Sequence, residues 1–196
     1  MKKIDKIKKL LRIIMIVLVI VIGIYAFKTV APSIKKESNE DIDKVKEYVL
    51  YRRDTELYKG IFNKLKEELN KESIDYNKYA EYISELFIID LYTLSNKNSS
   101  EDVGGIGYVL DSVKDNYKLN VSNTLYKYIN SIDEKPTVSS IELISKKDTT
   151  YKLNNKTYDG YEISLKWDYT KDLGYEKEGI VIVIKDNDKL FVVEKK

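Results

Sequence analysis

An uncharged apolar run near the N-terminus, Ile13 to Phe27, constrains this chain more than any other feature. Further apolar residues lie just beyond Arg12 and Lys28, whose long side chains can reach the two interfaces of a bilayer. The run then extends over residues 10–31, close to the roughly 20 residues that a membrane-spanning helix needs. We therefore expect a transmembrane helix over residues 10–31, with the lipid bilayer as its partner.

The charges that flank this run predict its orientation. Ahead of it the chain carries Lys2, Lys3, Lys6, Lys8, Lys9 and Arg12 against the single acid Asp5. Lysine and arginine accumulate on the cytoplasmic side of membrane proteins. We expect a single-pass protein of the cell membrane, with a basic cytoplasmic tail over residues 1–9. A polar tether over 32–40 and an extracytoplasmic domain over 41–196 then follow.

A cleaved signal peptide is the alternative for the same segment, and it would leave a secreted, soluble protein. The nearest small-residue site is Thr29-Val30-Ala31, but Pro32 follows it directly and disfavours cleavage. The chain has no cysteine, which excludes lipoprotein processing. A retained anchor is therefore the preferred interpretation.

Composition narrows what the outer segment can do. Beyond Lys28 the chain has 27 basic and 31 acidic side chains, a formal charge of −4, and no basic cluster that would follow a nucleic-acid backbone. It also has no histidine and no cysteine. These absences exclude imidazole bases, histidine-based zinc sites and disulfides. We therefore expect no catalytic, cofactor-binding or metal-binding residues, and no nucleic-acid partner.

Helical spacing dominates the first part of the outer segment. Apolar residues recur every three or four positions from Ile42 to Leu69, which predicts one helix over residues 42–69. A second apolar stripe runs from Tyr76 to Leu94. It predicts a helix that starts at a cap on Ser73 or Asp75 and ends near Asn96.

The next segment predicts shorter elements. Val103 to Leu110 indicates a bend and a short strand, and Asp111 to Tyr117 indicates one turn of helix. Ser122 is placed to cap a firmer helix. The apolar residues of that helix are Leu125, Tyr128, Ile129 and Ile132.

After Pro136 the apolar spacing changes to two, as in strands. The predicted strands cover residues 141–153, 161–169, 180–184 and 190–193. Asn154-Asn155 suits a hairpin turn between the first two strands. The predicted fold class is therefore α+β, with three helices packed on a curved antiparallel four-strand sheet.

This order of helices and strands resembles the cone-shaped fold named after nuclear transport factor two, over residues 40–194. With a single N-terminal anchor, the chain is similar to the inner-membrane scaffold proteins of type IV secretion and to their Gram-positive conjugation counterparts. The blocks from Phe87 to Lys97 and from Asp102 to Gly105 also resemble uncharacterised membrane proteins of Gram-positive bacteria. The resemblance implies a scaffold role and a cone-like domain, and it names no site residues.

Asp90 is the polar residue that most needs an explanation, because it lies at the edge of the apolar stripe of the second predicted helix. A carboxylate there must be hydrogen-bonded or charge-paired. It either lines the mouth of the cone as a functional acid or accepts N–H groups from the loop Asp102 to Gly105. We favour the second interpretation, because a glycine pair exposes its amides and no partner base exists.

An aromatic row in the second predicted strand is another candidate site. Tyr161, Trp167 and Tyr169 could form a ligand-binding platform. Ile163 and Leu165 lie between them on the same face, as on a sheet face covered by helices. We therefore expect a buried Trp167 that belongs to the core.

Acidic and glycine-rich clusters do not match known site patterns. The acidic clusters are Glu67-Glu68, Glu101-Asp102 and Asp186-Asn187-Asp188. None has the regular loop spacing of a calcium site. Gly104-Gly105-Ile106-Gly107 lacks the strand and helix that surround a nucleotide-binding loop. Loop and turn chemistry explains these residues.

Three functional interpretations remain. The favoured one is a membrane-anchored interaction or scaffold protein without catalytic activity, which binds itself or other envelope proteins and belongs to a secretion or conjugation assembly. The second is an envelope domain that binds a small apolar ligand or a cell-wall fragment. The third is a glycoside hydrolase that uses carboxylates alone, for which a segment of this size leaves little room.

Overall fold

The computed structural model describes residues 40–196, which belong to one compact unit. The predicted transmembrane helix over residues 10–31 lies outside the described residues, as does the predicted tether up to residue 39. Among residues 40–196, no helix combines the length and the apolar character needed to cross a bilayer.

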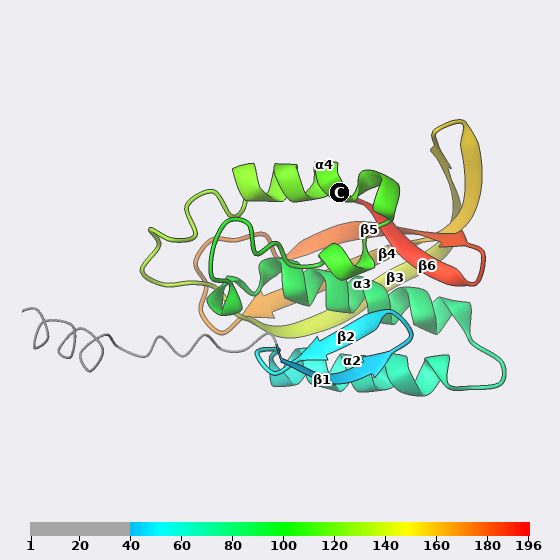
Figure 1. Cartoon of the computed structure of the whole chain (residues 1–196), viewed down its shortest axis with the longest axis horizontal. Helices are drawn as coiled ribbons and strands as arrows, with labels where there is room; N and C mark the ends of the chain where they lie inside the picture. The colour runs from blue at the N-terminus through cyan, green and yellow to red at the C-terminus, as the bar shows by residue number, and fades with distance from the viewer. Residues whose placement is uncertain (1–39) are drawn as a thin grey trace, which may run out of the picture. The chain divides into compact units, whose positions relative to one another are not determined.

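The described part of the chain is an α+β domain with three α-helices, a four-stranded antiparallel sheet and a two-stranded sheet (Figure 1). The helices are α2 (Glu56–Leu69), α3 (Tyr76–Tyr92) and α4 (Asp111–Asn123), with the short 3-10 turns η1 (Leu94–Asn96) and η2 (Ile106–Tyr108). The small sheet pairs β1 (Asp41–Val45) with β2 (Tyr48–Tyr51). The large sheet has the order β3 (Val138–Leu153), β4 (Lys156–Tyr169), β5 (Glu178–Asp186) and β6 (Lys189–Lys195). The predicted fold class and antiparallel meander are confirmed.

Helix α3 is the centre of the domain. It contacts all four strands of the large sheet and also packs against α2, so its residues from Ile83 to Ile89 are buried (Figure 1). Of the two predicted caps, Ser73 and Asp75, the structure uses Asp75, whose side chain accepts the backbone N–H groups of Asn77 and Lys78. The helix ends at Tyr92, earlier than predicted, and the chain continues into η1.

The large sheet follows the predicted alternation. Ile163, Leu165 and Trp167 of β4 are buried, and Trp167 is only 1% exposed. Its indole N–H donates to the Tyr169 hydroxyl at 2.9 Å, so the ring belongs to the core as expected. Residues 181–184 of β5 are buried on both faces, as their continuous apolar run predicted.

The predicted helix over residues 42–69 is wrong in its first half, which forms the β1–β2 hairpin. Lys46 has a φ of 50° at the turn, and a helix cannot pass through this left-handed conformation. Tyr48 and Leu50 are buried while Val49 between them is half-buried, which is the alternation of a strand. The helix itself begins after Thr55, whose hydroxyl accepts the Tyr58 N–H at 3.2 Å.

The prediction for residues 103–132 also needs correction. Instead of a short strand the chain forms η2, and Val109 makes only an isolated parallel bridge to Val192. The regular helix is α4, which starts at Asp111 where a single turn was expected. Ser122 lies inside its last turn and donates to the Ser100 carbonyl at 2.8 Å, so it caps no later helix. Beyond Asn123 the chain forms turns.

Candidate functional site

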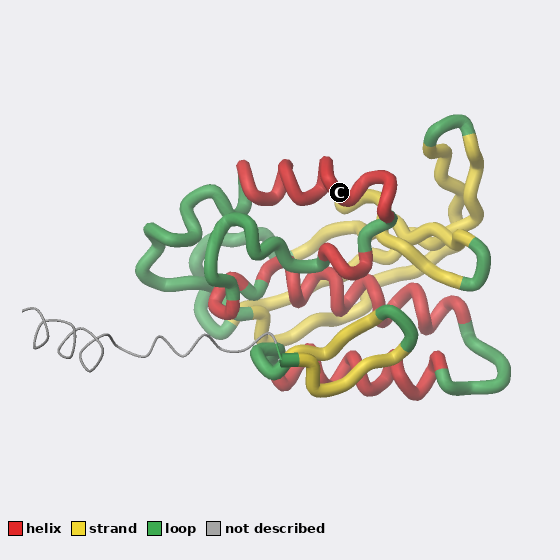
Figure 2. The backbone as a smooth tube through the Cα atoms, viewed as in Figure 1, coloured by secondary structure: helices red, strands yellow, loops and turns green. Residues whose placement is uncertain are grey.

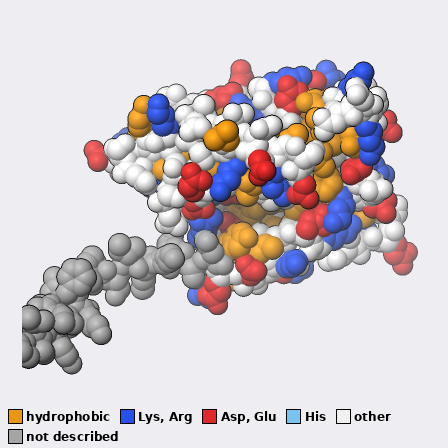
Figure 3. Space-filling model, turned by 45° about the horizontal axis from the view of Figure 1, so that its top comes forward, with side chains coloured by type: hydrophobic (Ala, Val, Ile, Leu, Met, Phe, Trp, Pro, Cys, Tyr) orange, Lys and Arg blue, Asp and Glu red, His pale blue; other side chains and the backbone are white. Residues whose placement is uncertain are grey.

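A cleft of about 570 Å³ lies between the β1–β2 hairpin and the segment of residues 101–108. Tyr58 of α2, Asp90 of α3 and Lys118 of α4 also line it. Figure 3 shows this side of the molecule hollowed, with apolar side chains in the hollow and charged side chains around it. Five segments of the chain therefore meet at one concave surface.

Tyrosines form the floor of this cleft. The rings of Tyr48 and Tyr108 stack with centroids 5.3 Å apart, and the hydroxyls of Tyr58 and Tyr108 share a short hydrogen bond. The Tyr48 hydroxyl is 2.7 Å from that of Tyr79 in the core. Burial raises the pKa of Tyr48, Tyr58 and Tyr108 well above the ordinary value, so all three stay neutral. The floor is therefore uncharged and held in place by ring stacking and hydrogen bonds.

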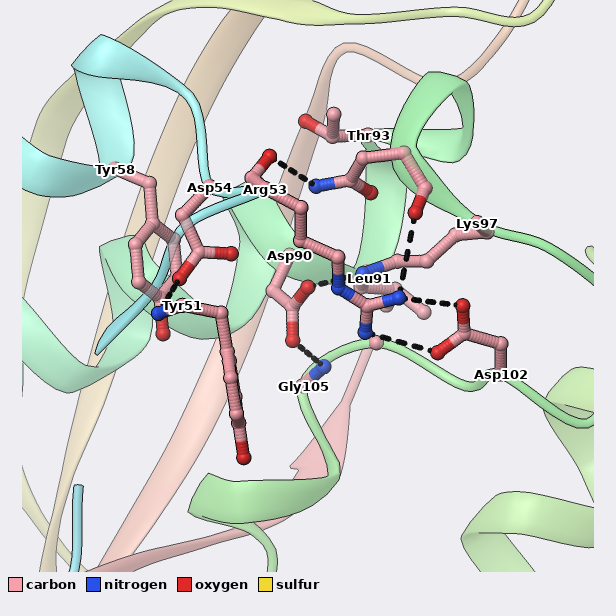
Figure 4. Close-up of polar contacts among 12 residues, drawn as sticks. Tyr51, Arg53, Asp54, Tyr58, Asp90, Leu91, Thr93, Lys97, Asp102 and Gly105 are labelled. Atoms are coloured by element: carbon pink, nitrogen blue, oxygen red, sulfur yellow. Dashed lines mark hydrogen bonds and ion pairs between the residues drawn. The ribbon is translucent and has the colours of Figure 1, made fainter. Parts of the chain in front are cut away.

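Asp90 points from α3 into the cleft wall and is fully engaged there (Figure 4). One carboxylate oxygen accepts the Gly105 N–H at 2.6 Å, which confirms the predicted contact with the glycine loop. The other oxygen pairs with the Lys97 ammonium. The Lys97 side chain is completely buried, and no local sequence pattern marks it as the partner of Asp90.

The glycine pair fits closely against α3. A Cβ on Gly104 would lie 2.0 Å from the Asp90 carbonyl oxygen, and Gly105 has a φ of 74°. Tyr126 accepts the Gly104 N–H at 3.2 Å, and Tyr117 donates to the Gly104 carbonyl at 2.6 Å. The loop is thus clamped on the helix that carries Asp90.

A second ion pair closes the cleft on the hairpin side. Arg53, just after β2, donates to both carboxylate oxygens of Asp102, at 2.6 and 2.9 Å (Figure 4). Burial acts to raise the pKa of Asp102, but hydrogen bonds from Arg53 and from the Asn98 N–H outweigh it and lower this pKa. The pair is therefore charged near neutral pH and joins the hairpin to the glycine loop.

Asp54 is an acid with altered chemistry beside this network. Burial raises its pKa to about 6, although the Tyr51 N–H donates to it at 2.7 Å. Asp54 is not among the residues that line the 570 Å³ cleft. Its proton is therefore not positioned to reach a ligand there.

The acidic clusters of the sequence are used in local structure. Glu68 accepts the Asp75 N–H at 2.8 Å and pairs with Lys71, and Asp186 pairs with Lys156 at 3.0 Å. Within residues 40–196, no group of three or more acidic side chains could hold a metal ion. Tyr161 and Trp167 lie on the core side of the sheet and do not line the cleft.

A second, more apolar cleft of about 400 Å³ lies between α3, α4 and β6. Phe87, Leu91, Val113 and Val192 are among its walls. Lys195 also lines it, and pairs with Glu176. This cleft has the size and lining of a site for a small apolar molecule.

Known proteins offer no guide to either cleft, since no family model, no curated protein and no solved structure matches the chain.

Proposed function

We propose that this chain is a single-pass membrane protein whose extracytoplasmic domain acts by binding, without catalytic turnover. The anchor is residues 10–31, with the N-terminus in the cytoplasm, and its partners are other envelope proteins or further copies of itself. A place in a secretion or conjugation assembly agrees with the resemblance of the chain to anchored scaffold proteins. The finer form of the domain is then the cone of the nuclear-transport-factor-two fold.

The observation that supports a binding role is the state of the charges in the 570 Å³ cleft. Asp90 is neutralised by Lys97, and Arg53 by Asp102. A reacting acid or base must be free to exchange a proton with a substrate, whereas these four groups hold one another and the surrounding loops in position. A partner would meet a concave surface with a tyrosine floor and with the charged side chains of Asp41, Glu47, Glu101 and Lys118 along its walls. Tyrosine is enriched in protein interfaces.

The proposed anchor is tested by protease treatment of intact protoplasts. We expect the protease to degrade the domain after Lys28 and to leave a small membrane fragment that contains residues 10–31. A protein that lacks an anchor leaves no membrane fragment, and a protein in the cytoplasm is not degraded. Release of a product that begins at Pro32 into the medium would contradict a retained anchor.

The binding role is tested by photocrosslinking in intact cells. A photoreactive phenylalanine at Tyr51, which lines the cleft, is expected to trap a specific protein adduct. The matched control places the same residue at Tyr128, which is 63% exposed and does not line the cleft. Equal labelling at both positions, or no adduct at Tyr51, would remove the support for a protein partner in this cleft.

The 400 Å³ apolar cleft favours a second candidate function, the binding of a small apolar ligand. The walls of this cleft come from the central helix α3 and from β6, and α4 covers it. Helix α4 is itself loosely packed, since Val121 is its buried residue. Under this alternative the crosslinker at Tyr51 traps no protein.

A further inference from the structure

The β3–β4 hairpin projects beyond the rest of the sheet as an arm. Pairing between β4 and β5 ends at Gly160, whereas β3 and β4 stay paired as far as Leu153 and Lys156. Figures 1 and 2 show this part as a two-stranded ribbon that extends away from the domain. A two-stranded ribbon is marginally stable by itself. The arm would therefore gain stability from a further strand at its edge.

The outer edge of β3 is suited to receive such a strand. In the large sheet β3 has β4 as its neighbour on one side, and no strand within residues 40–196 pairs with its other edge. A bulge interrupts β3 between Leu143 and Ser145, but from Ser145 to Leu153 its register with β4 is regular. Bulges, lysines and short length are the usual protections of an edge strand. Residues 145–153 of the arm contain no bulge and form a long strand, so lysines are the protection that this edge retains.

The turn fixes which backbone groups face the free edge. Asn154 and Asn155 have φ of 49° and 63°, as in a two-residue hairpin turn whose flanking residues form a hydrogen-bonded pair. Hydrogen-bonded and non-hydrogen-bonded pairs alternate along an antiparallel ladder. Asp148, Thr150 and Lys152 therefore direct their N–H and C=O groups away from β4, and all three are exposed.

The same residues are complementary to themselves when read in the opposite direction. In an antiparallel pair centred on Thr150, that threonine faces its own copy and Asp148 faces Lys152 on both sides of the centre. Thr149 then faces Tyr151, at the positions where an antiparallel ladder makes no hydrogen bonds. Opposite charges and Thr–Thr neighbours across two strands are each favourable. Both the charges and the hydrogen-bonding pattern thus fit a second copy.

Neighbouring registers lack this fit. Centring the pair on Asp148 or on Lys152 would set that residue against itself, and centring it on Thr149 would set Lys146 against Lys152. Like charges placed directly opposite are destabilising. Centring it on Tyr151 would run Asp148 against the turn and shorten the ladder. Of the five registers centred on residues 148–152, the one about Thr150 pairs opposite charges.

We propose that two copies of this chain associate through antiparallel pairing of their β3 arms about Thr150, so that the large sheet continues from one copy into the other. This inference rests on the proposed interaction function and deepens it, because it names a second copy as the partner. None of the residues that line the 570 Å³ cleft belongs to the arm.

Cysteine crosslinking of the full chain in membranes tests the pairing. The chain has no cysteine of its own, so Thr150→Cys introduces a single thiol. Residues in a hydrogen-bonded antiparallel pair have Cα atoms about 5.5 Å apart, within the range of a disulfide. We expect a disulfide-linked dimer under mild oxidation. The matched control, Thr157→Cys, lies exposed on β4 of the same arm and is expected to stay monomeric.

Charge exchange in the Thr150→Cys background tests the register of the pairing. Asp148→Lys alone and Lys152→Asp alone set like charges opposite each other, and each is expected to abolish the dimer in the Thr150→Cys background. The combination of both substitutions restores the opposite charges and is expected to restore the dimer. The two residues are exposed, so these variants leave the core intact.

Three outcomes would overturn the pairing. These are equal crosslinking of Thr150→Cys and Thr157→Cys, failure of the double exchange to restore the dimer, or capture of a different protein by Thr150→Cys with no homodimer. A specific adduct at Tyr51 alongside any of these results would leave the proposed interaction function standing. If the arms crosslink and Tyr51 gives no adduct, self-association remains as the binding role.

Discussion

Asp90→Asn is expected to lower the free energy of unfolding by about 3–5 kcal/mol, because it leaves a buried ammonium without its counter-charge. The Lys97 side chain is completely buried, and its ion-pair partner is the carboxylate that also accepts the Gly105 N–H. Asparagine can still accept that N–H but cannot neutralise the lysine. Denaturant unfolding of the full chain in mild detergent, followed by the fluorescence of the single tryptophan, measures the change.

The control for this prediction is the same substitution in an exposed pair. Asp111 pairs with Lys114 at 2.6 Å, but its side chain is 90% exposed, so Asp111→Asn should leave the stability nearly unchanged. Adding Lys97→Met to Asp90→Asn should recover much of the loss, because it removes the unpaired charge. An Asp90→Asn protein that kept full stability but lost an enzymatic activity would contradict the binding role and make Asp90 a catalytic acid.

Glu85→Gln is expected to stabilise the protein by about 3 kcal/mol above pH 7 and to leave its stability unchanged near pH 4. Glu85 lies on α3 and is only 6% exposed. Burial raises its pKa from 4.5 to about 7, and the charge of Glu81 adds to this, while Lys64 of α2 and Lys146 of β3 oppose it. The folded protein therefore holds a proton that the unfolded chain has already lost.

The sign of this effect follows from the two pKa values. Below pH 4.5 both states are protonated, and Glu85 carries no penalty. As the pH rises from 4.5 to 7 the unfolded chain ionises first, so stability falls until the folded state ionises as well. Glutamine removes this dependence. Comparison of unfolding free energies at pH 4 and pH 8 for wild type and variant isolates the contribution of Glu85.

Glu67→Gln is the matched control, because Glu67 is exposed on the neighbouring helix α2. It should leave the difference between pH 4 and pH 8 unchanged. Asp54, whose pKa is raised to about 6, contributes in the same direction in both the wild type and the variants and cancels in the comparison. An identical pH dependence in wild type and Glu85→Gln would mean that Glu85 is ionised and solvated in the folded protein.

The 570 Å³ cleft shows why the site was harder to predict than the fold. Asp90 could be assigned to the glycine loop from sequence, because a carboxylate at the edge of an apolar stripe requires donors and a glycine pair supplies them. The roles of Lys97 and Arg53 could not be predicted, because each lies in a polar segment, where lysine and arginine side chains are ordinarily exposed. Their burial depends on the hairpin and the loop closing over them, which no local pattern indicates.

The hairpin shows the same limit at the level of secondary structure. Over a segment as short as residues 41–51, apolar residues spaced by three and four positions do not distinguish a helix from two short strands. The choice was made by contacts far along the chain, where Tyr48 stacks on Tyr108 and donates to the Leu190 carbonyl at 3.2 Å. Tertiary packing routinely overrides a weak helical preference.

Periodicity, caps and turn residues act over a few neighbouring positions, so the antiparallel meander, the central helix and the turn at Asn154-Asn155 could be predicted from local patterns. The tyrosine-floored cleft, the two ion pairs around it and the projecting arm depend instead on tertiary packing. Arg53 and Asp102 are 49 residues apart in sequence, yet they pair at 2.6 Å. Such pairs are set by how the helices and strands pack, because burial and electrostatic pairing depend on distance in space.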